Sequence, residues 1–279
     1  MARFSSRQAL LAGGAFALVL SLNGQVTAQP GYVPNFQTGP NGWQHPFGGE
    51  FSALQGSASP VMDDPAHPHF SNEMARINRV QPTYRIGDLS NANLKQWAKD
   101  VMKKDNDEVL KGKIAYTPGQ ACQPPGVPAF ILNQGPVVFL QTPTKVTIIE
   151  ESSQQVRHVY MNVPHSPNPK PSWLGESIGR YEGDTLVVDT VGLNTKTFVD
   201  AYRTPHTEKL HVVERWRIIE NGNTLEVRVT IDDPDTFYQP WQTYQLYRRA
   251  RQPFAEDICQ EGNLTLFDYG VPVAKKADF

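Results

Sequence analysis

The chain lacks both a surplus of charge of one sign and a long hydrophobic run outside its N-terminus. Its 26 Lys and Arg residues nearly balance 28 Asp and Glu residues, so the net charge is -2. Proteins that bind nucleic acid by neutralising phosphates need a basic surface, and this composition excludes that class. No later segment approaches the roughly 20 apolar residues that span a bilayer as a helix. Heptads and longer repeats are also missing, which argues against a coiled coil or a solenoid.

The first 28 residues have the pattern of a secretory signal peptide. Arg3 and Arg7 supply the positive charge, residues 9–22 form the apolar run, and residues 26–28 end in a small-residue cleavage site. The apolar run is short for a membrane-spanning helix, and an uncleaved anchor is the alternative interpretation. The pattern predicts a periplasmic or secreted bacterial protein with no membrane span after cleavage.

Cysteine is scarce, since the chain has two, Cys122 and Cys259. An oxidising compartment favours a disulfide between them. Closing so long a loop would stabilise the fold by about 4 to 5 kcal/mol in the chain-entropy model. A catalytic thiol is the alternative, but neither residue lies in a Cys-x-x-Cys pair.

Three regions follow the signal peptide. Residues 29–62 are rich in Gly, Pro, Asn and Gln, have no periodicity, and are interpreted as an extended or disordered leader. Residues 63–120 are expected to form a helical extension, with a short helix near residues 71–79 and a clear one over residues 90–110. Ser90 is the expected N-cap, and the apolar face of that helix repeats at helical spacing: Leu94, Trp97, Ala98, Val101 and Met102.

Residues 121–279 have the sequence pattern of a β domain. Eight short strands are expected, separated by turn sequences such as Glu-Gly-Asp and Asn-Gly-Asn. They lie at residues 137–141, 145–151, 155–162, 177–181, 184–191, 210–220, 224–232 and 241–249. Tight hairpins favour antiparallel pairing, and closure removes exposed strand edges. The sequence therefore predicts a mainly β protein, an antiparallel barrel of lipocalin-like architecture with an N-terminal helical extension.

Alternation within the strands assigns side chains to the two faces. In residues 210–218 every second residue is apolar except Glu214, which is therefore expected on the inner face. A buried carboxylate is costly unless it is paired, so Glu214 should find a partner or have a raised pKa. Arg157 and Arg180 are the candidate partners. Asp189 is likewise a carboxylate within an apolar strand, so it too should find a partner or have a raised pKa.

These residues predict an exported enzyme that uses acid–base chemistry, of the isomerase, lyase or decarboxylase type, on a small apolar or aromatic compound. The expected catalytic residues are Glu214, Asp189, His211, His206 and Arg180. The expected ligand-binding residues lie around a barrel cavity: Trp173, Trp216, Tyr160, Trp241 and Arg157. No cofactor is expected, because no cofactor-binding loop is recognisable.

Three alternatives remain open. A structural Glu–Arg pair that stabilises the barrel would account for Glu214 without catalysis. A lipocalin-like carrier for a small hydrophobic ligand would need no reactive group. A metal-dependent enzyme is the third, and its ligands would come from His165, His206 and His211, although no pair has the His-x-x-x-His spacing of a zinc helix.

Two motifs in the β region resemble the signature of a widespread family of secreted bacterial proteins. They are PSWLGESIGRYEGDTLVVDT at residues 171–190 and LHVVER at residues 210–215, and the likeness extends over about residues 121–261. One departure lies at residues 161–165, where such proteins carry an Asp-Gly turn before a His-Pro pair. The family is known mainly as uncharacterised, so the resemblance implies a shared fold and no activity.

Overall fold

The computed structural model describes residues 33–45, 49–69, 85–113, 116–133, 135–152 and 155–259. The predicted signal peptide and the short helix expected near residues 71–79 lie outside the described residues. Among the described residues, no helix is long and apolar enough to cross a membrane.

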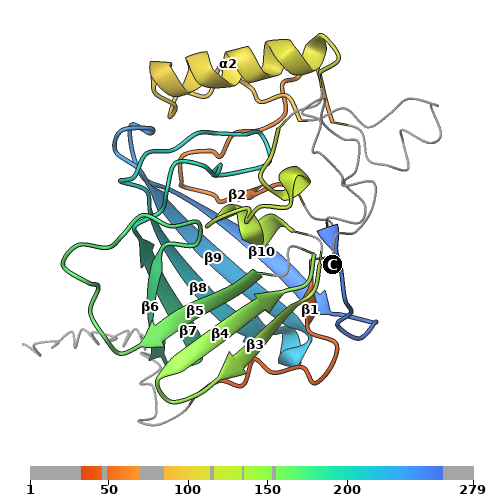
Figure 1. Cartoon of the computed structure of the whole chain (residues 1–279), viewed down its shortest axis with the longest axis vertical. Helices are drawn as coiled ribbons and strands as arrows, with labels where there is room; N and C mark the ends of the chain where they lie inside the picture. The colour runs from red at the N-terminus through yellow and green to blue at the C-terminus, as the bar shows by residue number, and fades with distance from the viewer. Residues whose placement is uncertain are drawn as a thin grey trace, which may run out of the picture.

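The fold is mainly β, and its strands close into a barrel (Figure 1). The expected strands are all present: β3 (Val137–Gln141), β4 (Lys145–Glu150), β5 (Gln155–Met161), β6 (Glu176–Glu182), β7 (Thr185–Val191), β8 (His211–Ile219), β9 (Thr224–Asp232) and β10 (Trp241–Arg249). Two further strands, β1 (Trp43–Gln44) and β2 (Ser52–Ala53), come from the segment before them. Within the described residues β1 pairs with both β3 and β10 and closes a ring of nine strands, while β2 adds to β10.

One strand pair differs from the antiparallel prediction. β5 and β6 pair in parallel, with Val159 opposite Ser177, whereas the other pairs of the ring are antiparallel. Parallel strands need a crossover of a dozen or more residues. Residues 162–175, which contain four prolines, supply that crossover as an irregular loop. The barrel is therefore mixed, and this loop lies over its outer surface.

The region expected as an extended or disordered leader is part of the barrel core. Phe36, Trp43, Phe51 and Val61 are each 3% exposed or less. Nε1 of Trp43 donates a hydrogen bond to the carbonyl of Phe36 at 2.8 Å, which satisfies the indole inside the core. Large aromatic side chains in this region gain more from burial than the segment loses in chain entropy, so a polar, glycine-rich composition did not keep it outside the fold.

The predicted helix is present but begins later. Helix α2 spans Gln96–Leu110 and lies across one end of the barrel (Figure 1), with Ala98, Met102 and Asn106 buried. Ser90 does not cap it, because the backbone N–H and hydroxyl of Ser90 both donate to Asp88. Trp97 is 38% exposed, so the buried face is narrower than expected. The described residues also contain three short 3-10 helices: η1 (Gly119–Ala121), η2 (Ala129–Leu132) and η3 (Glu220–Gly222).

Aromatic side chains pack one on another inside the barrel. The ring of Phe139 lies 5.4 Å from that of Phe36 and 5.4 Å from that of Trp216, and Trp216 lies 5.7 Å from Tyr247. These four side chains are 1% exposed or less. Strand alternation predicted that Trp216 points inward, and Phe36, Phe139 and Tyr247 pack with it inside the barrel.

The predicted disulfide is confirmed. Cys122 and Cys259 are bonded, with their Cα atoms 5.5 Å apart. The bond ties the segment between α2 and β3 to the segment after β10.

Candidate functional site

The inner carboxylate predicted from strand alternation is present and is paired with Arg157. Nη1 of Arg157 on β5 lies 2.9 and 2.8 Å from the two carboxylate oxygens of Glu214 on β8. Nη2 of Arg157 donates to Oγ1 of Thr190 at 2.7 Å, and Nε donates to Oγ of Ser177 at 3.1 Å. The guanidinium also lies 5.0 Å from the ring centroid of Phe130. Each guanidinium nitrogen therefore has an acceptor.

This pair has the environment of a structural ion pair. Glu214 is 0% exposed and Arg157 is 3% exposed. Burial raises the pKa of Glu214, and the charge and hydrogen bonds of Arg157 oppose that shift. A group that exchanges protons with a substrate needs a free lone pair and access. Side chains on the outer surface of the barrel meet these two requirements better than the buried Glu214 does.

The residues expected around a barrel cavity do not share one wall. Trp216 and Trp241 point inward and are 1% exposed or less, and Trp241 packs against Phe51 and Phe237. Tyr160 lies on the outer face of β5 and is 50% exposed, because it belongs to the outward set of its strand. Trp173 lies in the crossover loop with Nζ of Lys196 5.7 Å from its ring centroid. Of these residues, the two tryptophans on β8 and β10 and Arg157 are inside.

A chain of four polar side chains lies on the outer face of β6, β7 and β8. Oδ1 of Asp189 accepts hydrogen bonds from Nε2 of His211 at 2.8 Å and from Nε2 of His165 at 2.9 Å. The other ring nitrogen of His165 lies 3.0 Å from Oε1 of Glu176. The structure thus brings together three residues singled out from the sequence, Asp189, His211 and His165, and adds Glu176, which strand patterning did not single out. We call this group the outer His–Asp chain.

The register of the sheet places these side chains next to one another. Asp189 pairs with Val213, and His211 lies two residues before Val213 on the same face. Glu176 pairs with Val191, two residues beyond Asp189. Such diagonal neighbours on one face are within reach of long side chains. His165 arrives from the crossover loop, which is held in place because the backbone N–H of Ser166 donates to Glu176 at 2.7 Å.

Hydrogen bonding sets the charges of the outer His–Asp chain. Its donors, His211 first, lower the pKa of Asp189 to about 2, against the effect of partial burial. The hydrogen bond to Asp189 raises the pKa of His211. Hydrogen bonds from Ser166 are the main cause of the lowered pKa of Glu176. The side chains of Asp189, His165 and Glu176 are 23 to 25% exposed and that of His211 is 41% exposed, so solvent reaches the group.

The remaining predicted residues lie elsewhere. His206 is 4% exposed in the loop before β8, where its ring bonds Thr197 and the carbonyl of Thr207, and burial lowers its pKa. Arg180 lies on the outer face of β6 and pairs with Glu182 at 2.6 Å. His165 and His211 converge, but His206 does not join them. The described part of the chain contains no group of three or more His, Cys, Asp or Glu residues arranged to hold a metal ion.

Asp200 is a buried carboxylate that lies outside the outer His–Asp chain. Burial raises its pKa to about 6, and the residue borders a cavity of about 210 Å³. Its oxygens accept hydrogen bonds from the backbone N–H groups of Tyr202 and Thr204 and from the hydroxyl of Thr204, at 2.8 to 3.2 Å. These bonds close the turn at residues 200–204, which is a structural use of the carboxylate.

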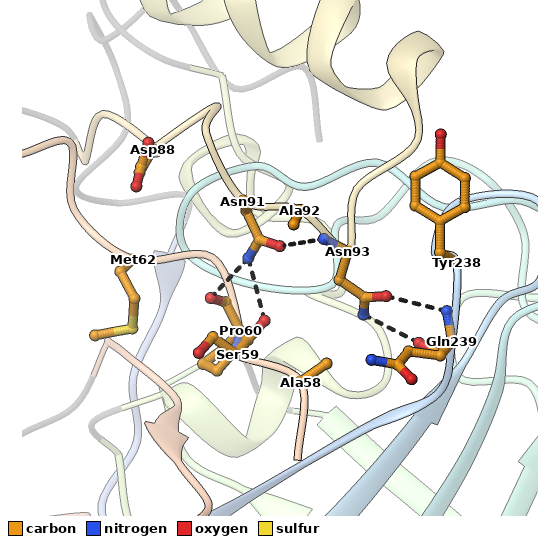
Figure 2. A pocket seen from close by; sticks show the side chains of 10 residues that line it. All are labelled: Ala58, Ser59, Pro60, Met62, Asp88, Asn91, Ala92, Asn93, Tyr238 and Gln239. Carbon is orange, nitrogen blue, oxygen red and sulfur yellow. Dashed lines mark hydrogen bonds between the residues drawn. The ribbon is translucent and has the colours of Figure 1, made fainter. Parts of the chain in front are cut away.

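A pocket near α2 also escaped sequence reasoning (Figure 2). Its volume is about 530 Å³, within the usual range for small-molecule sites. Its lining comes from three segments that are distant in sequence: Ala58, Ser59, Pro60, Met62, Asp88, Asn91, Ala92, Asn93, Tyr238 and Gln239. Nothing in strand or helix periodicity predicts that these segments meet.

Comparison with known proteins adds no relative. No protein-family model, no curated protein and no solved structure matches the chain.

Proposed function

We propose that the protein is an exported enzyme that performs acid–base chemistry on a small apolar or aromatic compound at the outer His–Asp chain. His211 is the residue that transfers the proton, and Asp189 is the carboxylate that orients it. The observation that carries this proposal is the 2.8 Å hydrogen bond between Nε2 of His211 and Asp189 at a place that solvent reaches.

The geometry suggests how a proton would move. Because Asp189 accepts a hydrogen bond at Oδ1, the proton of neutral His211 resides on Nε2 and the lone pair on Nδ1. Nδ1 then takes a proton from the substrate, and the resulting imidazolium is stabilised by the Asp189 carboxylate. Return of the proton to another atom of the same molecule completes an isomerisation. Loss of a leaving group or of carbon dioxide before the proton returns gives an elimination or a decarboxylation.

His165 and Glu176 act as positioning residues in this proposal. His165 holds Asp189 at Oδ1 from the other side, and its second ring nitrogen is anchored on Glu176. A carboxylate fixed by two donors loses little freedom when it binds the imidazolium form of His211. Preorganisation of this kind is a large contribution to enzymatic rate enhancement.

Two alternatives have less support. A carrier with its ligand inside the barrel would need space that Phe139, Trp216 and Tyr247 occupy. A catalytic Glu214 would need release from Arg157. Export is supported by the disulfide and by the N-terminal sequence pattern.

The test is solvent hydrogen exchange. Purified protein is incubated in D2O with a panel of small aromatic and terpenoid-like keto acids, hydroxy acids and enones, and mass spectrometry records deuterium uptake and product formation. The His211→Gln variant should lose 10²- to 10⁴-fold in rate. The matched control is His158→Gln, an outer-face histidine on β5 that bonds Thr147. Absence of any reaction with the wild type, or equal rates in His211→Gln, would contradict the proposal.

A further inference from the structure

The pocket in Figure 2 is formed by residues outside the outer His–Asp chain. One wall is the segment at residues 58–62, a second is the segment at residues 88–93 before α2, and the third is the turn at Tyr238 and Gln239 before β10. The pocket joins parts of the chain separated by up to about 180 residues, so its shape depends on the completed fold.

Two asparagines cross-link the walls. Nδ2 of Asn91 donates to the carbonyls of Ser59 and Pro60 at 3.1 and 3.0 Å. Asn93 exchanges two hydrogen bonds with the backbone of Gln239, both at 3.0 Å (Figure 2). These hydrogen bonds fix the positions of the three segments relative to one another. The pocket is therefore preformed, and a ligand would not have to order it on binding.

One end of the pocket is acidic. The two oxygens of Asp88 accept hydrogen bonds from the N–H and the hydroxyl of Ser90 at 2.8 and 2.9 Å, and each oxygen retains a further acceptor position. Asp88 also borders an adjoining cavity of about 300 Å³ that Asp64 and Asp107 line. Lys103 in that cavity is paired with Asp107 at 2.6 Å. Among the described residues that line these two cavities, negative charges thus outnumber positive ones.

The opposite end is aromatic. Tyr238 is 69% exposed and borders the pocket at the end away from Asp88 and Met62 (Figure 2). Nζ of Lys95 lies 5.8 Å from the ring centroid of Tyr238. A second cation at this end would be repelled by Lys95, whereas an apolar or aromatic group can pack on the ring.

We propose that this pocket binds a small organic cation, an amine carried on an apolar or aromatic body. The ammonium group donates to the carboxylate of Asp88, and the body packs against Pro60, Met62 and Tyr238. The charges at the two ends fix the orientation, because Asp88 attracts the amine and Lys95 disfavours it. Charge-assisted hydrogen bonds to a carboxylate are the stronger class, so the amine should dominate affinity.

Three probes of one shape and different charge test the proposal. Phenethylamine, 2-phenylethanol and 3-phenylpropionate are titrated into the full-length mature protein, and binding is followed by NMR chemical shifts. Phenethylamine should bind most tightly and 3-phenylpropionate most weakly. Asp88→Asn should weaken phenethylamine binding on the order of tenfold and leave 2-phenylethanol unchanged, since Asn keeps an acceptor for Ser90 but no charge. Tyr238→Ala should weaken the binding of both phenethylamine and 2-phenylethanol by roughly threefold to tenfold.

Matched controls separate the site from the rest of the surface. Asp184→Asn removes an exposed carboxylate outside the pocket, and Tyr160→Ala removes an exposed ring on β5. Both variants should bind phenethylamine as the wild type does. His211→Gln should also bind it as the wild type does, because this pocket is separate from the proposed catalytic site. Thermal unfolding verifies that each variant is folded. The proposal is overturned if phenethylamine does not bind, if the anion binds equally well, or if neither pocket substitution weakens binding.

Discussion

The barrel wall carries two carboxylates with opposite surroundings on neighbouring strands. β8 directs Glu214 inward and His211 outward, and β7 directs Thr190 inward and Asp189 outward. Glu214 is closed off by Arg157 in an interior without solvent contact. Asp189 lies on the other face of the same sheet, paired with Val213, which directly precedes Glu214, and it has two histidine partners and access to water.

Desolvation decides what each of these two carboxylates can do. Separating Glu214 from Arg157 would leave two charges unpaired in a medium of low dielectric, so the pair stays closed. Asp189 and His211 can each gain or lose a proton while water screens the change. Reactivity is therefore expected on the outer face and structural stabilisation on the inner face.

The largest expected effect comes from breaking the inner pair. Arg157→Met leaves Glu214 buried without its partner and should lower the free energy of unfolding by about 3 to 5 kcal/mol, measured by urea denaturation at pH 7. The matched control is Arg180→Met, which removes an exposed arginine paired with Glu182 and should cost less than about 1 kcal/mol. Equal losses in the two variants would show that the inner pair has no special role.

Removing both inner charges should restore much of that loss. The double variant Arg157→Met with Glu214→Leu places apolar groups where the pair lies, and such replacements are often neutral. We expect it to unfold at a higher urea concentration than Arg157→Met alone. A double variant less stable than the single one would mean that the hydrogen bonds to Thr190 and Ser177, not the unpaired charge, carry the effect.

The outer His–Asp chain should stabilise the fold within a defined pH window. Asp189 has a lowered pKa, so its contribution is present above pH 3.8 and is lost as pH falls towards 2. His211 has a raised pKa, so its contribution is present below pH 6.5 and is lost as pH rises through the folded value. Wild type and Asp189→Asn should therefore differ most between about pH 4 and 6.5, by about 1 kcal/mol after solvent screening.

Urea denaturation of both proteins at several pH values measures this difference. Asp184→Asn, an exposed substitution in the turn before β7, is the control and should show no such window. A difference between wild type and Asp189→Asn that is constant from pH 3 to 9 would contradict the assignment of charges in the chain.

The smallest expected effect is on a single titration. In Asp189→Asn the pKa of His211 should fall towards its ordinary value of 6.5, because its hydrogen bond to a carboxylate is the main cause of the increase. Two-dimensional NMR of the imidazole resonances records this shift. The control is the set of His158 resonances, which should be the same in both proteins at each pH, since His158 bonds Thr147 and not Asp189. An unchanged pKa of His211 in Asp189→Asn would mean that the side chains of His211 and Asp189 do not interact in solution.

Strand alternation and turn chemistry were sufficient for most of the barrel. Burial alternates with period 2 in β4, β5 and the first part of β8, and the inward position of Glu214 follows from that period. The disulfide followed from there being two cysteines. β1 could not be predicted, because a two-residue strand has no periodicity and Trp43 is defined as core by distant partners, Val137 and Arg249. The parallel pairing of β5 with β6 was also missed, since its crossover contains no helix.

The candidate sites depended more on tertiary structure. Asp189 and His211 were singled out from the sequence, but their contact with His165 depends on how the crossover loop lies on the barrel. Tyr160 was assigned to the interior, although its strand alternation places it outside with Val156 and His158. The pocket of Figure 2 brings Asp88 to the same space as Tyr238, 150 residues later, and no local pattern records such a meeting.

The most direct test of the central claim compares the two faces in one assay. Turnover of the best compound from the D2O panel is measured for wild type, His211→Gln and the double variant Arg157→Met with Glu214→Leu, each verified as folded. We expect a loss of 10²-fold or more for His211→Gln and a rate within about threefold of wild type for the double variant. Loss of turnover in the double variant with full activity in His211→Gln would contradict it and place the chemistry inside the barrel.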